Sequence, residues 1–217
     1  MRRLSTTTAF ALVSLTLAVA SPALAQTAKR PATGAAPAVL SARVDYAGQF
    51  QTVCAVCHGA SGRSDMAGVP VLAGNSSLYV ITQLFLFREG RRKNEAMVAM
   101  AKPMTDADLK GFSDYIGTLV AVDAPVLSSA PDAARMLKAK ALAEQHKCTY
   151  CHGADLAGGQ QVPRIGGQKE DYLRQTLHDF KAGERPGYTR AMTEALSQVP
   201  VEDLDLLAFY AANIGNK

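Results

Sequence analysis

The sequence predicts an all-α protein made of two similar small domains in tandem. The first observation is an internal repeat, because residues 54–59 (CAVCHG) are matched 94 positions later by residues 148–153 (CTYCHG). The second is helical spacing of apolar side chains in each copy, and the third is that no segment alternates apolar and polar residues as a half-buried strand would. With 217 residues, 48% hydrophobic and 19% charged, the chain has the composition of an ordered globular protein.

The N-terminus has the pattern of a secretory signal peptide over residues 1–25. Arg2 and Arg3 form a positive start, residues 9–20 are mostly apolar, and small residues precede a cleavage point after Ala25. An uncleaved anchor is the alternative, but this apolar stretch of 12 residues is shorter than the ~20 residues needed to span hydrocarbon. We therefore expect export to the periplasm and no integral membrane segment in the mature chain.

The charge of the mature chain excludes one class of partner. Removing residues 1–25 lowers the basic residues from 23 to 21 against 19 acidic ones, so the formal net charge falls from +4 to +2. That excess is too small for a nucleic-acid footprint, and no nucleic-acid partner is expected. Residues 26–40, rich in Ala, Thr and Pro, are expected to form a flexible leader.

The repeat divides the rest of the chain into two domains. Residues 70–74 (PVLAG) are matched by residues 163–167 (PRIGG). Four further positions keep this register, pairing Tyr79, Leu84, Phe87 and Gly90 with Tyr172, Leu177, Phe180 and Gly183. We therefore expect an N-terminal domain over residues 41–120, a linker with proline and serines over residues 121–130, and a C-terminal domain over residues 131–217.

Each copy is expected to contain a middle helix and a final helix. Apolar residues recur at helical intervals over residues 78–89 and again over residues 171–182. Residues 105–108 (TDAD) resemble a capping box at the start of the final helix of the first copy. Pro200 stands near the first turn of the final helix of the second copy. The segments rich in Gly and Pro between the cysteine motifs and the middle helices are expected to be long loops.

The two CxxCH motifs indicate the chemistry. On a helical turn, both cysteines of a motif can form thioethers to one haem while the following histidine faces the iron. A disulfide, a thioredoxin-like redox pair and a zinc site are the alternatives. A thioredoxin-like pair needs a βαβ setting, and paired zinc knuckles are usually closer than the roughly 90 residues between these motifs. We therefore expect two covalently bound c-type haems with His58 and His152 as axial ligands. The attaching cysteines are Cys54, Cys57, Cys148 and Cys151.

A methionine is the expected second axial ligand of each iron. In the second copy the only methionine after the motif is Met192, 40 residues beyond the histidine. The first copy offers Met97, Met100 and Met104. The repeat selects Met97, because Met97 and Met192 each precede the first leucine of their final helix by 12 positions, and Met100 is the alternative. Histidine and methionine together leave no open position on the iron, which favours electron transfer over substrate binding.

The other ring nitrogen of a ligating histidine usually donates to a fixed acceptor. The duplicated candidates are the carbonyl groups of Pro70 and Pro163, 12 and 11 residues beyond the histidines. An equally open interpretation is that these prolines only shape their loops.

A basic cluster precedes the first of these methionines. Arg88, Arg91, Arg92 and Lys93 are expected to lie near the exposed edge of the first haem, where they would steer an acidic redox partner. The alternative is a solvated helix end whose cations suit the helix dipole.

The two motifs, the P-x-[LI]-x-G segments, the Y-x-x-x-x-L-x-x-F helices and the methionines together resemble the dihaem cytochrome c4 family over nearly the whole mature chain. The resemblance implies two tandem class I cytochrome c domains related by pseudo-twofold symmetry, with haems close enough for rapid electron exchange. It also implies Pro70 and Pro163 as the histidine partners and Met97 rather than Met100. The segment from Glu89 to Met97 is short compared with the family pattern.

The same resemblance implies a periplasmic electron carrier, not an enzyme, that delivers electrons toward a terminal oxidase of a respiratory chain. Its partners would be redox donors and acceptors, including a membrane oxidase, and we expect a monomer. An electron-accepting subunit of a dehydrogenase or of a sulfur-oxidising complex is the alternative. A dihaem peroxidase is disfavoured, because it needs an iron that can open its sixth position.

Overall fold

The computed structural model describes the chain in three stretches, residues 44–124, 131–185 and 190–214. The predicted signal peptide, the predicted leader and residues 125–130 of the predicted linker lie outside them. We refer to residues 44–124 as the N-terminal half and to the described residues from 131 to 214 as the C-terminal half.

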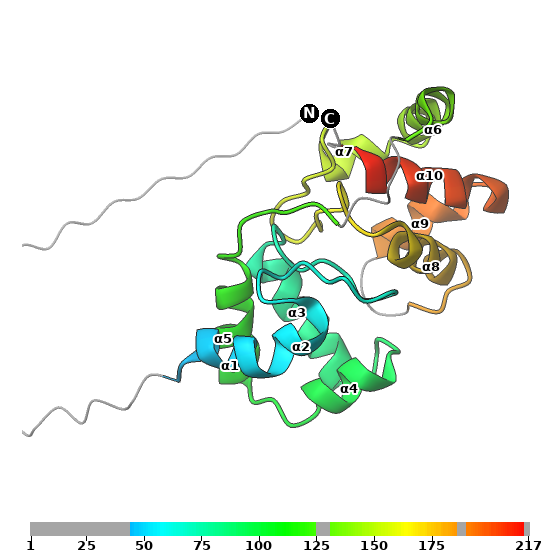
Figure 1. Cartoon of the computed structure of the whole chain (residues 1–217). Coiled ribbons are helices and arrows are strands. Elements are labelled where there is room, and N and C mark those ends of the chain that lie inside the picture. The colour runs from blue at the N-terminus through cyan, green and yellow to red at the C-terminus, as the bar shows by residue number, and fades with distance from the viewer. Residues whose placement is uncertain (1–43, 125–130, 186–189, 215–217) are drawn as a thin grey trace, which may run out of the picture. The chain divides into compact units, whose positions relative to one another are not determined.

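Helices are the regular elements of the described residues, beside one isolated β-bridge between Gly159 and Val162. The helices of the N-terminal half are α1 Tyr46–Gln49, η1 Phe50–Cys54, α2 Ala55–His58, α3 Ser77–Arg88, α4 Glu95–Ala101 and α5 Asp106–Ile116. Those of the C-terminal half are α6 Ala133–Gln145, α7 Cys148–His152, α8 Glu170–Lys181, α9 Arg190–Ser197 and α10 Val201–Asn213. Figure 1 shows them as two groups, one for each half of the chain. The predicted all-α fold is confirmed.

The predicted middle and final helices are all present. Helices α3 and α8 each begin and end one residue earlier than predicted. The hydroxyl of Ser76 explains the start of α3, because it accepts a hydrogen bond from the Tyr79 amide and so caps the helix. Thr105 and Asp108 form the predicted capping box at the start of α5, and Pro200 is the residue before α10.

The helices that the sequence does not predict include α4, α6 and α9. Helix α4 has seven residues, too few to show a clear helical period. Its start is nevertheless marked by Asn94, whose side chain accepts a hydrogen bond from the Met97 amide. Asp132 caps α6 in the same way through the amide of Arg135. These caps were the available local signal.

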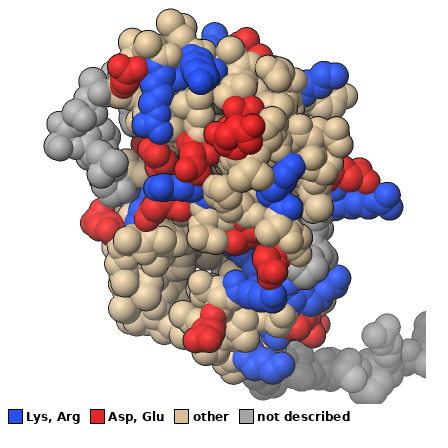
Figure 2. Space-filling model, turned by 90° about the vertical axis from the view of Figure 1, so that its right-hand side faces the viewer, with Lys and Arg blue, Asp and Glu red and all other residues tan. Residues whose placement is uncertain are grey.

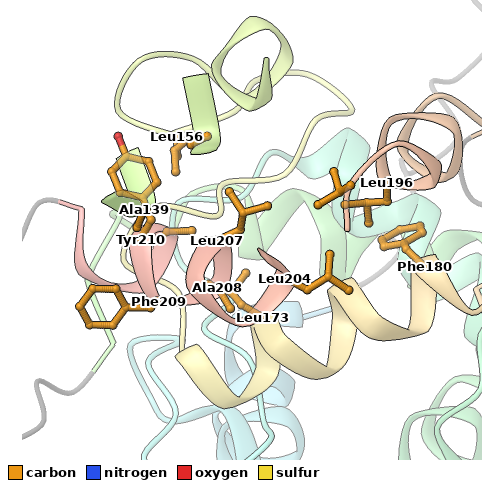
Figure 3. Close-up of a cluster of buried hydrophobic side chains, with 13 residues drawn as sticks. Ala139, Leu156, Leu173, Phe180, Leu196, Leu204, Leu207, Ala208, Phe209 and Tyr210 are labelled. Atoms are coloured by element: carbon orange, nitrogen blue, oxygen red, sulfur yellow. The ribbon is translucent and has the colours of Figure 1, made fainter. Parts of the chain in front are cut away.

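Each half has its own apolar core. In the N-terminal half α3 packs against α5, and the buried residues are Phe50, Val80, Leu84, Leu109, Phe112 and Ile116. In the C-terminal half α10 packs against both α6 and α8. Figure 3 shows apolar side chains of α8 and α10, among them Leu173, Leu204 and Leu207, gathered in this core. Burying one such side chain contributes ~1.5–3 kcal/mol, so each cluster stabilises the helix packing of its own half.

The halves meet through the loops that follow their cysteine motifs. In Figure 1 the cyan loop after α2 and the yellow loop after α7 lie between the two helix groups. The amide of Gly68 donates to the carboxylate of Asp171 at 2.7 Å, and the ammonium group of Lys169 donates to the carbonyl of Met66. The predicted long loops are therefore present, and they form much of the contact between the halves. Within the three described stretches, no helix is both long and apolar enough to cross a membrane.

Candidate functional site

A cavity of about 920 Å3 is lined by residues of both halves. Eight of the ten predicted site residues belong to its wall, namely His58, Pro70, Met97, Cys148, Cys151, His152, Pro163 and Met192. The other two, Cys54 and Cys57, lie outside the wall. Its volume lies in the range of sites that enclose a cofactor. The structure thus places the histidine and the methionine predicted for each half around one cavity.

Both cavity histidines are held by a proline carbonyl. The Nδ1 atom of His58 lies 3.1 Å from the oxygen of Pro70, and Nδ1 of His152 lies 3.0 Å from the oxygen of Pro163. A carbonyl oxygen only accepts hydrogen bonds, so in each ring Nδ1 carries the hydrogen. The remaining nitrogen, Nε2, then has a free lone pair, which is the form of imidazole that binds a metal.

Burial keeps these two rings in the neutral form. His58 and His152 are only 7% and 8% exposed. Desolvation lowers the pKa of both rings, and it outweighs the hydrogen bonds to the proline carbonyls, which act in the opposite direction. Both rings are therefore uncharged donors to a metal near neutral pH.

Each histidine lies at the end of a short helix that the next glycine terminates. Gly59 and Gly153 have φ angles of +76° and +81°, a conformation that strains other residues. A Cβ at Gly59 would also lie 2.2 Å from the carbonyl oxygen of Arg63. The chain can therefore turn away directly after each histidine, and the loop that follows brings the proline carbonyl back to the ring.

The methionines differ in where they lie. Met97 in α4 and Met192 in α9 both line the cavity, and each also packs against the core of its own half. Met100 is 42% exposed and is not part of the cavity wall, whereas Met104 packs against the N-terminal core. The structure therefore places Met97, and not Met100, on the same cavity as His58.

The cysteines repeat one pattern in both halves. Cys54 and Cys148 are partly buried, whereas Cys57 and Cys151 are exposed, and none of the four forms a disulfide. Burial raises the pKa of the Cys54 and Cys148 thiols. In each motif the two cysteines stand one helical turn apart beside the buried histidine, which is the spacing that two thioethers to one haem require.

Of the arginines that line the cavity, Arg92 and Arg185 each lie against an aromatic ring, and sequence reasoning did not place them in the site. A guanidinium nitrogen of Arg92 donates to the hydroxyl oxygen of Tyr172 at 2.8 Å, while the group lies 4.4 Å from the centre of the Phe87 ring. Arg185 is 9% exposed and stacks on Phe180 at 4.6 Å. Arg92 and Arg185 occupy matching positions of the repeat, 93 residues apart, which was the available signal.

Arg185 also gives a direct test of whether a haem fits. Its Nε atom is buried and has no hydrogen-bond partner in the described structure. An unpaired buried guanidinium nitrogen is costly, so Arg185 is suited to pair with an anionic group that enters the cavity. The propionate carboxylates of a haem have this character. The residues present, with neutral histidines, spaced cysteines and lining arginines, therefore fit the expected haems.

The basic cluster predicted as a docking surface does not form one exposed patch. Arg88 forms an ion pair with Asp106 at 2.7 Å, and Lys93 forms one with Glu184 at 2.5 Å. Arg92 is part of the cavity wall. On the face drawn in Figure 2, basic and acidic side chains are interspersed. Most of the cluster's charge is therefore paired or turned inward.

Comparison with known sequences matches both halves to one family. The family described as Cytochrome c matches residues 47–119 and again residues 136–210. The chain is 34% identical over 143 residues to cytochrome c4 of Thiocapsa roseopersicina, covering 61% of this chain and 71% of that protein. It is 31% identical over 178 residues to cytochrome c4 of Stutzerimonas stutzeri, covering 73% and 82%. It is also 31% identical over 166 residues to the thiosulfate dehydrogenase electron acceptor of Thiomonas intermedia, covering 67% and 76%.

Solved structures with a similar fold include a cytochrome c4. Reduced recombinant cytochrome c4 from Pseudomonas stutzeri superposes with a TM-score of 0.69 at 25% identity, covering 78% of this chain and 96% of that chain. Thiosulfate dehydrogenase from Marichromatium purpuratum gives a TM-score of 0.64 at 31% identity, covering 73% of this chain and 36% of that chain. Both solved structures therefore share the fold of the part of this chain that they match.

Proposed function

Since the chain belongs to the cytochrome c family, as a dihaem member of the cytochrome c4 group, we propose that it is a periplasmic electron carrier serving a terminal oxidase of a respiratory chain. It carries two covalently bound c-type haems and is an electron-transfer protein, not an enzyme. We further propose the compartment, the direction of electron flow and the residues that hold each haem.

We assign one haem to each half. Cys54 and Cys57 attach the first haem, and His58 and Met97 are its axial ligands. The equivalent set for the second haem is Cys148, Cys151, His152 and Met192. One observation carries this assignment: both histidines have Nδ1 against a proline carbonyl and line a cavity that both methionines also line.

A bound c-type haem supplies a one-electron iron couple, and the chain sets its properties. The proline carbonyls fix the histidine rings and raise their basicity, which favours the ferric state. The methionine side chains would fill the remaining axial position, and no site for a substrate would then be left on the iron. Arg92 and Arg185 place positive charge in the cavity wall, where they would pair with haem propionates.

A second candidate function is supported by the relatives. The proteins from Thiomonas intermedia and from Stutzerimonas stutzeri strain A1501 are named thiosulfate dehydrogenase electron acceptor, and the chain is 31% and 30% identical to them. This chain would then take electrons from a sulfur-oxidising dehydrogenase before passing them on. The two roles differ in the donor and not in the chemistry at the haems.

The function is tested by rapid mixing of the haem-loaded protein with each type of partner. Reduced protein is mixed with membranes that contain the terminal oxidase, and oxidised protein is mixed with thiosulfate and a thiosulfate dehydrogenase. The carrier proposal expects fast oxidation by the membranes, sensitive to an oxidase inhibitor. Fast reduction only by the dehydrogenase would favour the second candidate. Rapid turnover of hydrogen peroxide would contradict both.

The compartment is tested separately. Expression of the full chain in a Gram-negative host that assembles c-type cytochromes should give a periplasmic protein whose N-terminus follows Ala25, as measured by intact mass with two haems added. A haem-loaded protein that retains residues 1–25 and sediments with membranes would contradict this part of the proposal. Sedimentation of the soluble protein also tests the expected monomer.

A further inference from the structure

The peptide group that holds each axial histidine is itself held by the opposite half. In the N-terminal half, the carbonyl of Pro70 contacts His58, and the amide of the same peptide unit belongs to Val71. That amide donates to Oε1 of Gln168 at 2.8 Å, and Nε2 of Gln168 donates back to the carbonyl of Val71 at 2.9 Å. Both residues are buried, since Val71 is 3% exposed and Gln168 is 6% exposed.

The C-terminal half has the mirror arrangement. The carbonyl of Pro163 contacts His152, and the amide of the same peptide unit belongs to Arg164. That amide donates at 3.2 Å to Oδ1 of Asn75, which is 6% exposed. Asn75 and Gln168 are matching positions of the repeat, 93 residues apart. Each half therefore sends one buried amide side chain across to the proline peptide of the other.

A peptide group transmits such a contact because it is planar and polarisable. Its plane is rigid, so fixing the N–H direction also fixes the direction of the C=O group. When the N–H of a peptide group donates a hydrogen bond, the carbonyl oxygen of the same peptide group becomes more negative. Successive hydrogen bonds of this kind strengthen one another in a low dielectric. A more negative carbonyl makes the histidine a better electron donor to iron, and this stabilises the ferric form.

We propose that Gln168 and Asn75 are crossed positioning residues: Gln168, from the C-terminal half, tunes the potential of the first haem, and Asn75, from the N-terminal half, tunes that of the second. This proposal rests on the proposed assignment of His58 and His152 as iron ligands. It adds that each haem's potential depends on a side chain of the other half. Gln168 makes two bonds to Val71 where Asn75 makes one to Arg164, so the first haem depends more on the contact.

The test measures both midpoint potentials by optical redox titration of haem-loaded variants. Gln168→Met keeps the side-chain length but removes both hydrogen bonds to Val71, together with the one that Oε1 accepts from the Lys169 amide. It should raise the potential of the first haem more than that of the second. Asn75→Ala should raise the potential of the second haem more than that of the first, by a smaller shift. Repeating each variant in the Met192→His background, where the transition of the second haem is moved, assigns the transitions.

A control variant and a second measurement separate a positioning role from a general weakening of the interface between the halves. Lys169→Gln removes a neighbouring bond across the same interface, to the carbonyl of Met66, which contacts neither proline peptide. It should shift neither haem selectively. Proton NMR gives a second reading that does not depend on potentials, since the Nδ1–H proton of His58 should exchange with solvent faster in Gln168→Met, and that of His152 faster in Asn75→Ala.

Failure of this proposal can be distinguished from failure of the proposed function. If Gln168→Met does not fold, Asn75→Ala still tests the crossed relation, because it loses only one hydrogen bond between the halves. Shifts confined to the haem of the mutated half, equal shifts at both haems, or no shift would overturn the proposal. A wild-type protein with fewer than two redox transitions would instead contradict the proposed function and its ligand assignment.

Discussion

The guanidinium group of Arg92 in the N-terminal half donates a 2.8 Å hydrogen bond to the hydroxyl of Tyr172 in the C-terminal half. It also donates to the side-chain oxygen of Gln83 at 2.6 Å. The sequence hypothesis had this arginine on an exposed docking surface beside Arg91. The structure places it in the cavity wall instead, so its charge acts on the interior of the protein.

Replacing this arginine should lower the potential of the first haem. The positive charge of Arg92 is close enough to His58 to lower the pKa of that ring, although burial of the ring is the larger cause. Removing a cation favours the ferric state, so Arg92→Gln should lower the potential by an amount on the order of tens of mV. Redox titration of the haem-loaded variant measures the shift. Arg91→Gln is the matched control, because Arg91 is exposed, and an equal shift in both variants would show that the placement of Arg92 is irrelevant.

Exchanging the proposed methionine ligands should affect one haem at a time. Met97→His and Met192→His should each lower one of the two potentials, because imidazole donates to ferric iron more strongly than a thioether does. Both covalent attachments should persist in a haemochrome assay. Met100→Leu should leave both potentials unchanged, since Met100 is 42% exposed and lies away from the cavity wall. A normal pair of potentials in Met97→His would exclude Met97 as a ligand.

A glycine in α5 is required by a close approach between two helices. A Cβ at Gly111 would lie 2.0 Å from the Tyr46 ring, which also contacts Phe112 edge-on. Helix propensity alone favours alanine there by ~1 kcal/mol. We expect Gly111→Ala to reduce the free energy of unfolding by ~1–3 kcal/mol through overpacking. In a Tyr46→Ala background, denaturant titration should show that Gly111→Ala instead increases the free energy of unfolding. The same decrease in both backgrounds would contradict the role of the contact between Gly111 and the Tyr46 ring.

The capping box of α5 should make stability depend on pH in one direction. Hydrogen bonds from the hydroxyl and amide of Thr105 lower the pKa of Asp108 below its ordinary 3.8. Its stabilising effect is therefore complete above pH 3.8 and is lost as the pH falls through the lower, folded-state pKa. Asp108→Asn removes the titrating group, so wild type should have the higher Tm at pH 7 and this difference should shrink in acid. A Tm difference between wild type and Asp108→Asn that grows as the pH falls would contradict this prediction.

The sequence was most informative where the signal is local and repeated. The middle helices were predicted within one residue at each end, because their apolar residues recur over three turns and the repeat shows the pattern twice. The same repeat selected Met97 among three neighbouring methionines. The helices that carry Met97 and Met192 were missed, because one has seven residues and the other eight, too few for a clear period.

The contacts between the halves could not be predicted from local patterns. Whether Arg92 points to solvent or to the cavity depends on how the loops of the two halves meet, and that depends on packing over the whole chain. The same holds for the contact of Gln168 with Val71, which joins residues 97 positions apart. The repeat did align Asn75 with Gln168, but two matching amides have no meaning until the facing peptide groups are known.

The central claim is that the chain holds two haems, each bound by one histidine and one methionine of its own half. An optical redox titration of the mature protein, combined with a haemochrome assay, tests it most directly. We expect two haems per chain, two one-electron transitions and, at neutral pH, low-spin ferric spectra typical of methionine ligation. One haem per chain, or a high-spin ferric haem at neutral pH, would contradict it.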